Sequence, residues 1–360
     1  MTVTINGTTG LSTTTGSVVS NNTPGKNLAI NGAMKIAQRG DVAGVEYGYG
    51  GCDRWRFSGG SAARVTMNQT TGPTAEGFAY CQELDVTTAD ASLAAGDYNM
   101  LSHKWEGYDL QHIQKGTSDA KSLTVSFWVS SPKTGTHIVE LYDQANSRQI
   151  SKAYTVSSAD TWENKTVTFA GDTTGTITND NDARLTLEFW LCAGSTYSSG
   201  TLNTSWASIT NANRAVGQVN TMDNTSNNFK LTGVQVEIGD TATNFEHRSY
   251  GDEIAKCQRY YFQSDNFKVS CAKGPVRGEA YSTTELFAHV QYPQPMRAAP
   301  TWIVCDNSGN TGAVHKIGNP DVSGVSVDRY GATSGVRITK STAWTAGDGY
   351  MFTYSVDAEL

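Results

Sequence analysis

The chain has 360 residues, which is room for two domains, and 38% of them are hydrophobic while only 17% are charged. Its net charge is −7, and the densest basic run, Lys256 to Arg259, contains two neutral residues. A nucleic-acid partner is therefore not expected, and without an apolar run of about 20 residues neither is membrane insertion.

Residues 1–27 are rich in Thr, Ser, Asn and Gly and carry only isolated Val, Ile and Leu residues. Such a segment cannot form a core alone. It is either a flexible tail or an extended arm that becomes ordered against partner chains, because sparse β-branched residues suit strand addition. The first residues also lack the basic and apolar regions of a secretory signal.

Residues 28–247 are expected to form one domain of many short strands. After a turn at Asn31-Gly32 and a loop rich in Tyr and Gly at 45–51, Trp55 and Phe57 alternate with arginines, as in a half-buried strand. Alternating apolar residues then predict further strands at 121–131, 136–142, 162–169, 184–192 and 230–238. Short strands separated by Gly-, Asn- and Asp-rich turns are typical of a β-sandwich or barrel.

One helix is predicted over 248–264, where Tyr250, Ile254, Cys257 and Tyr261 fall on one face. Acidic residues in its first turn and basic residues later agree with the helix dipole. The helix is expected to link the first domain to residues 265–360, where strand patterns return and predict a smaller C-terminal β-sandwich.

Several separated motifs, in the same order, resemble a domain common in bacteriophage tail fibres and other virion structural proteins. They are NLAINGAMKIAQRG, DRWRF, WEGYDLQHIQKGTSDAKSLTVSFWVSS, DTWENKTVTFAGDTTGT, LCAGSTYSSG, FKLTGVQVEIGDTATNFEHRSYGDEIAKCQRYY and PQPMRAAPTW. The resemblance covers 27–360 and implies an all-β chain: a jelly-roll sandwich like that of carbohydrate-binding modules, then a small β-domain, often in homotrimeric fibres. It does not imply a defined set of functional residues.

Catalytic and metal-binding patterns are weak. The carboxylates that could form a glycan-cleaving pair show no spacing that singles out two of them: Asp53, Glu106, Asp109, Glu140 and Glu188. Glu140 and Glu188 lie on predicted strands whose other face is apolar, so solvated outward side chains are expected. No GxSxG, HExxH or P-loop occurs, and the chain is expected not to be an enzyme and to need no cofactor.

A calcium site at Asn179–Asp182 is weighed against a plain Asx turn, and the turn is favoured. The six cysteines form no CxxC pair and are expected to be buried free thiols, as in a protein made in a reducing cytoplasm: Cys52, Cys81, Cys192, Cys257, Cys271 and Cys305.

Aromatic residues remain as candidates for contact with a sugar, which commonly stacks on an exposed ring. Trp55, Trp128 and Trp190 lie on strands and are assigned to the core. The candidates in or beside glycine-rich loops are Tyr47, Tyr49, Tyr330, Trp344 and Tyr350.

The sequence thus predicts a bacteriophage tail-fibre or receptor-binding virion protein. It would attach to a host surface glycan or outer-membrane receptor through the tip formed by 265–360. Residues 1–27 would contact other virion proteins or the partner chains of a homotrimer. The alternatives are a purely structural virion component, such as a head fibre or tail adaptor, and a glycan-cleaving tail spike.

Overall fold

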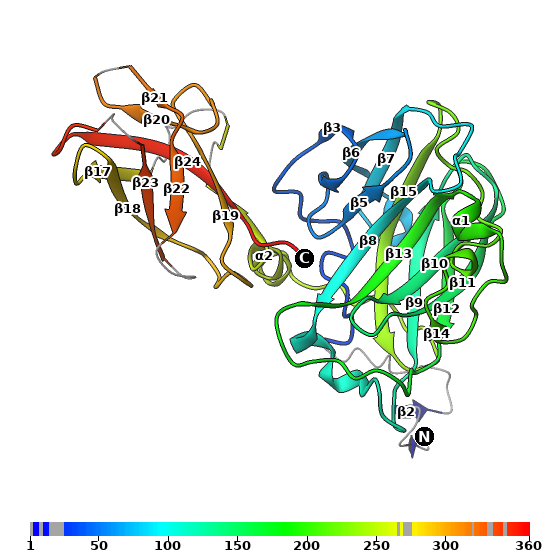
Figure 1. Ribbon diagram of the computed structural model, residues 1–360. Coiled ribbons are helices and arrows are strands. Elements are labelled where there is room, and N and C mark those ends of the chain that lie inside the picture. The colour runs from blue at the N-terminus through cyan, green and yellow to red at the C-terminus, as the bar shows by residue number, and fades with distance from the viewer. Residues whose placement is uncertain are drawn as a thin grey trace.

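A computed structural model describes residues 3–6, 10–13, 25–264, 267–268, 276–318, 320–329, 334–340 and 344–360. Two antiparallel sheets face each other to form a sandwich (Figure 1). The first has the order β14-β11-β10-β13-β8-β5-β4, with bounds Ala207–Ser208, Arg148–Val156, Gly135–Asp143, Ala183–Ala193, Tyr98–Glu106, Arg56–Gly59 and Gly48–Tyr49. The second has the order β12-β9-β15-β7-β6-β3, with bounds Glu163–Phe169, Leu123–Ser130, Asn228–Ile238, Tyr80–Thr88, Arg64–Thr71 and Val42–Val45.

Alternation along the strands creates the core between these sheets. On β13, Leu185, Leu187 and Phe189 are buried, and Phe189 packs edge-on against Phe127 of β9 with ring centroids 5.0 Å apart. Trp55 joins the same core, as expected from its strand-like surroundings. The all-β class and the sandwich are confirmed, because apolar residues at every second position can be buried only between two layers.

The predicted helix is α2, Tyr250–Gln258, which is shorter than the expected range. Ser249 caps it, since its side chain accepts a hydrogen bond from the backbone N–H of Asp252. The helix stops because residues Tyr261–Gln263 form strand β16, which pairs with β24, Gly349–Asp357. Cys257 and Tyr260 are buried against Ile30 and Ile36, so the helix packs on the first residues of the sandwich.

The C-terminal strands belong to a single curled sheet of nine strands instead of two facing layers (Figure 1). Long β24 is its centre and pairs with β16, β17, β19 and β20. The remaining strands of this sheet are Val276–Ala280 (β17), Glu285–Gln291 (β18), Thr301–Cys305 (β19), Ala313–Lys316 (β20), Val322–Ser323 (β21), Ser326–Arg329 (β22) and Ser334–Thr339 (β23). The curl lets one sheet enclose its own core.

Buried ion pairs join this sheet to the sandwich. Glu359 pairs with Arg54 and, at 3.3 Å, with Arg39. Arg54 is fully buried with its guanidinium 3.4 Å from the ring centre of Tyr260. Arg259, just after α2, donates two hydrogen bonds of 2.8 and 2.7 Å to the carboxylate of Glu106. Nothing in the local sequence around Arg54 marks this arginine as interior.

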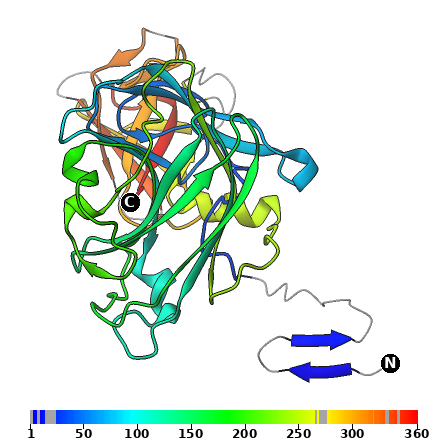
Figure 2. The ribbon, with the colours of Figure 1, turned by 90° about the vertical axis from the view of Figure 1, so that its right-hand side faces the viewer.

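Within the N-terminal segment, Val3–Asn6 and Gly10–Thr13 pair as antiparallel strands β1 and β2 (Figure 2). Five cysteines are buried free thiols, as expected, and Cys271 lies outside the described residues. None of the described helices has the length and apolar character needed to cross a bilayer.

Candidate functional site

A polar groove of about 320 Å³ lies on the outer face of the seven-stranded sheet. It has the size of a small-ligand site. Its walls and floor carry five aromatic side chains: Tyr47, Tyr98, Tyr142, Trp190 and Tyr197. Four charged side chains line it as well: Arg56, Lys104, Glu188 and Arg214. We call this site the tyrosine groove.

Strand alternation builds the floor of the tyrosine groove. Cross-strand partners lie on the same face of a sheet. The register places Glu140 of β10 opposite Glu188 of β13, Glu188 opposite Ser102 of β8, and Ser102 opposite Arg56 of β5. These four residues form one row across four strands, with their apolar neighbours directed to the core. The groove therefore follows from the period of two that buries the sandwich interior.

A buried ion network holds the middle of the floor. The guanidinium of Arg214 donates from Nε to Glu140 at 3.0 Å and from Nη2 to Glu188 at 2.7 Å. The indole Nε1 of Trp190 donates to Glu140 at 2.8 Å. Burial raises the pKa of both carboxyl groups, and Arg214 opposes that rise. The guanidinium also lies 4.7 Å from the ring centre of Tyr142, which orients that tyrosine at the groove wall.

Two irregular segments supply the remaining wall. Tyr197 lies on the short helix α1, Ser195–Ser198, and packs edge-on against Tyr98 with centroids 5.3 Å apart. Its carbonyl accepts a 2.9 Å hydrogen bond from the backbone N–H of Ala215. That bond ties α1 to the segment that carries Arg214. The aromatic wall and the cation are thus fixed to each other before any ligand arrives.

Two of the sequence candidates lie at β4, Tyr47 just before it and Tyr49 within it, and the structure separates them. Tyr47 is 61% exposed and lines the tyrosine groove, where the guanidinium of Arg56 lies 3.9 Å from its ring centre. Tyr49 is half-buried, and its hydroxyl donates a 2.9 Å hydrogen bond to the carbonyl of Leu360. Tyr49 therefore contacts the end of the C-terminal sheet and not the groove.

Two of the other candidates, Trp344 and Tyr350, do not lie at the surface. Trp344 is 3% exposed and Tyr350 is fully buried, and their rings pack edge-on at 4.9 Å inside the core of the C-terminal sheet. Both rings lie in that core because its curled sheet encloses large side chains, contrary to the surface position expected from the adjoining glycine-rich loops. Tyr330 lies outside the described residues. Trp190, assigned to the core by its strand position, is fully buried but forms part of the groove floor.

The carboxylates also differ from expectation. Glu140 is fully buried and Glu188 is 7% exposed, so the prediction of solvated outward side chains is wrong. The physical reason is Arg214, which covers and neutralises them from a segment distant in sequence. Asp53 and Glu106 are buried elsewhere. Asp53 accepts hydrogen bonds from Gln38, and burial raises the pKa of this carboxyl to about 6.

The loop Asn179–Asp182 uses its oxygens within the protein. Asp180 accepts a 2.8 Å hydrogen bond from Nε of Arg184. The backbone carbonyl of Asn181 accepts one of 2.7 Å from Arg297, in the segment before β19. This loop therefore contacts the C-terminal part of the chain. Across the described ranges, no group of three or more His, Cys, Asp or Glu side chains is placed to hold a metal ion.

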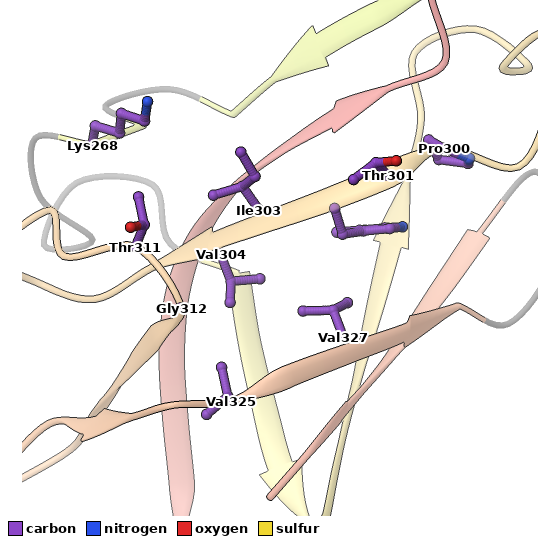
Figure 3. A pocket seen from close by; sticks show the side chains of 10 residues that line it. Lys268, Pro300, Thr301, Ile303, Val304, Thr311, Gly312, Val325 and Val327 are labelled. Carbon is purple, nitrogen blue, oxygen red and sulfur yellow. The ribbon is translucent and has the colours of Figure 1, made fainter.

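A second hollow of about 690 Å³ lies in the C-terminal sheet between β19 and β22. Figure 3 shows Val304 of β19 and Val327 of β22 pointing into the space between these strands, with Val325 beside them. Its lining is mainly aliphatic, with threonines and Lys268 as its polar members. It has one aromatic ring, that of Trp302, and no paired charges, whereas the tyrosine groove has five rings and an ion network and is the better candidate site.

No family model matches the chain, and no curated protein matches it in sequence. Among solved structures, tailspike protein 4 of bacteriophage CBA120 is 12% identical over 59% of this chain and 22% of its own length, with a TM-score of 0.30. The chain thus spans about a fifth of that tailspike domain. A family 11 carbohydrate-binding module from Clostridium thermocellum, solved with a mixed-linked β-1,3-1,4 tetrasaccharide, is 14% identical over 58% of this chain and 98% of its own, at 0.29. The module TmCBM61, solved with β-1,4-galactotriose, is 11% identical over 59% and 99%, at 0.30. The similarity to carbohydrate-binding modules and to a phage tailspike domain is thus distant and partial.

Proposed function

We propose that the protein recognises a host surface glycan in the tyrosine groove and serves as an attachment protein of a bacteriophage particle. The observation that carries glycan recognition is the combination of Tyr98, Tyr142 and Tyr197 around a floor of charged side chains. Sugars bind by stacking their apolar ring face on aromatic side chains while charged and amide groups read the hydroxyls. The phage setting is supported by the ordered sequence motifs and by an N-terminal segment without an apolar core of its own.

The experiment is binding of the full chain to an array of bacterial glycans, followed by titration with the best ligand. Tyr98→Ala and Tyr197→Ala should each lower affinity at least tenfold, because each removes a stacking surface. Tyr108→Ala is the matched control, since Tyr108 is 55% exposed and lies outside the groove. If no glycan binds, or if the control loses as much affinity as the groove variants, the proposal fails.

We propose that recognition proceeds without bond cleavage. Glycosidases need a carboxyl group that reaches the glycosidic oxygen. Here Glu140 is fully buried, and both of its oxygens accept hydrogen bonds, from Trp190 and Arg214. Glu188 is held by the same guanidinium. Incubation with the glycan that binds should therefore yield no new reducing ends, and their appearance would show that the protein is an enzyme.

The proposal also includes how the protein is assembled into the particle. Residues 1–27 attach the protein to the virion or to the other chains of a homotrimer. Light scattering at micromolar concentration tests the trimer, and a monomer would count against it. Protein lacking 1–27 should fold and bind glycan yet fail to enter particles.

A further inference from the structure

Two cations in the tyrosine groove have no acidic partner. Arg214 is neutralised by Glu140 and Glu188. Arg56 and Lys104, by contrast, form no ion pair with any carboxylate of the described part of the chain. Arg56 packs on the ring of Tyr47, and the ammonium of Lys104 has no protein hydrogen-bond partner there. With both carboxylates ionised, the three cations leave the groove one positive charge in excess, on a chain whose net charge is −7.

These cations lie close together on the floor. Arg56 is opposite Ser102 on the neighbouring strand β8, and Lys104 is the next residue of β8 on the same face. Both therefore point into the groove from adjacent strands. Their side chains are half-buried, which leaves the charged ends accessible to a ligand but only partly hydrated.

The electrostatics of this pair are unfavourable in the empty groove. Burial, followed by repulsion from Arg56, lowers the pKa of Lys104 to about 8. Glu188 and Glu359 oppose the shift, and Arg54 adds to it, so the acidic neighbours do not compensate the loss of water. Burial also lowers the pKa of Arg56. A partly desolvated cation pair that no carboxylate contacts as an ion pair costs free energy that a bound anion would recover.

We propose that the tyrosine groove selects saccharides that carry an anionic group, held by Lys104 and Arg56 while the sugar ring stacks on the tyrosine wall. This inference rests on the proposed glycan recognition and specifies its substrate class. A uronic-acid carboxylate and a sulfate ester would supply the same charge. Arg56 can bind either with two parallel hydrogen bonds, and Lys104 adds a point charge. Glu188 is left to accept a hydrogen bond from a sugar hydroxyl.

The test is a glycan array in which each anionic polysaccharide is printed beside its own neutral product. Carboxyl reduction converts uronates to neutral hexoses, and desulfation removes sulfate esters. The strongest signals should come from anionic members, and neutralisation should weaken them at least tenfold. Loss of signal after carboxyl reduction identifies a carboxylate as the bound group, and loss after desulfation identifies a sulfate.

Variants then assign the effect to residues. Lys104→Met and Arg56→Gln should each lower affinity for the anionic ligand at least tenfold and affinity for its neutral product by a smaller factor, so that the ratio of the two affinities falls. Lys104→Met should also unfold at no lower temperature than the wild type, because it removes an uncompensated cation. Lys121→Met is the control, since Lys121 is exposed and outside the groove.

The outcomes separate the two proposals. If neutral and anionic glycans bind equally, and Tyr98→Ala abolishes both, the anionic preference is refuted while glycan recognition stands. If no printed glycan binds, glycan recognition itself is refuted, and the anionic preference is refuted with it.

Discussion

Replacing Arg214 with methionine tests the ion network beneath the tyrosine groove. Methionine keeps much of the side-chain volume but removes the charge that Glu140 and Glu188 share. Glu140 is fully buried and cannot recover hydration, and Glu188, which is 7% exposed at the groove floor, can recover only part of it. Removing one member of a buried ion pair costs about 3–5 kcal/mol of unfolding free energy. We expect a loss in this range at pH 8.

The loss should shrink as the pH falls. Without Arg214, the raised pKa values of the two carboxyl groups rise further, so the native variant takes up protons that the unfolded chain does not bind until about pH 4.5. Proton uptake by the native state stabilises it. A proton that the native variant binds and the native wild type does not, across three pH units, contributes about 4 kcal/mol to this recovery. Most of the loss should therefore be recovered at pH 5.

Urea unfolding at pH 5 and pH 8, followed by tryptophan fluorescence, measures both values. Arg64→Met is the control, because Arg64 pairs at the surface with Glu46 and should lose less than about 1 kcal/mol. Adding Glu140→Gln and Glu188→Gln to the Arg214 variant should restore stability at pH 8. An equal loss at both pH values, or no recovery with the glutamines, would refute the reasoning.

Three further predictions concern other parts of the molecule. Glu359→Gln leaves the buried guanidinium of Arg54 without its carboxylate, and thermal unfolding should show a loss of about 3 kcal/mol; a loss below 1 kcal/mol would contradict the buried pair. Gly233 on β15 has a φ of +59°, and an added Cβ would lie 2.7 Å from a phenylalanine ring. Gly233→Ala should therefore cost about 1–3 kcal/mol in denaturant unfolding, whereas Gly96→Ala, with open space around it, should cost little. Finally, affinity for an anionic glycan should fall as the pH rises from 7 to 9, because Lys104, with its pKa of about 8, loses its proton; calorimetry in buffers of different ionisation enthalpy should detect proton uptake on binding, and a flat profile would exclude Lys104 from the contact.

Strand periodicity predicts the sandwich well, because burial between two layers requires apolar residues at every second position of a strand. Leu185, Leu187 and Phe189 identify the inward face of β13 by alternation alone. The same alternation contains the groove floor, since the outward positions between them include Thr186 and Glu188. The groove could have been predicted from strands whose outward positions combine charged and aromatic residues.

The remainder of the site could not be found from local patterns. Arg214 lies in an irregular segment, 26 residues from Glu188 and 74 from Glu140, and only the folded chain brings the three together. Tyr197 reaches the groove from a four-residue helix, and that helix has no side-chain N-cap that would have predicted it from sequence. Trp344 and Tyr350 were wrong as surface candidates because a neighbouring loop rich in glycine does not determine whether a ring points inward.

The alternation along β8 and β13 has a consequence for how this protein can diversify. Positions that determine ligand preference are interleaved with positions that determine core volume, yet their side chains lie on opposite faces. Substitutions at Ser102, Lys104 or Thr186 can therefore change what is recognised while the buried neighbours stay as they are. Under the proposed function, single changes on one face could follow a host that alters its surface polymer, without rebuilding the scaffold beneath.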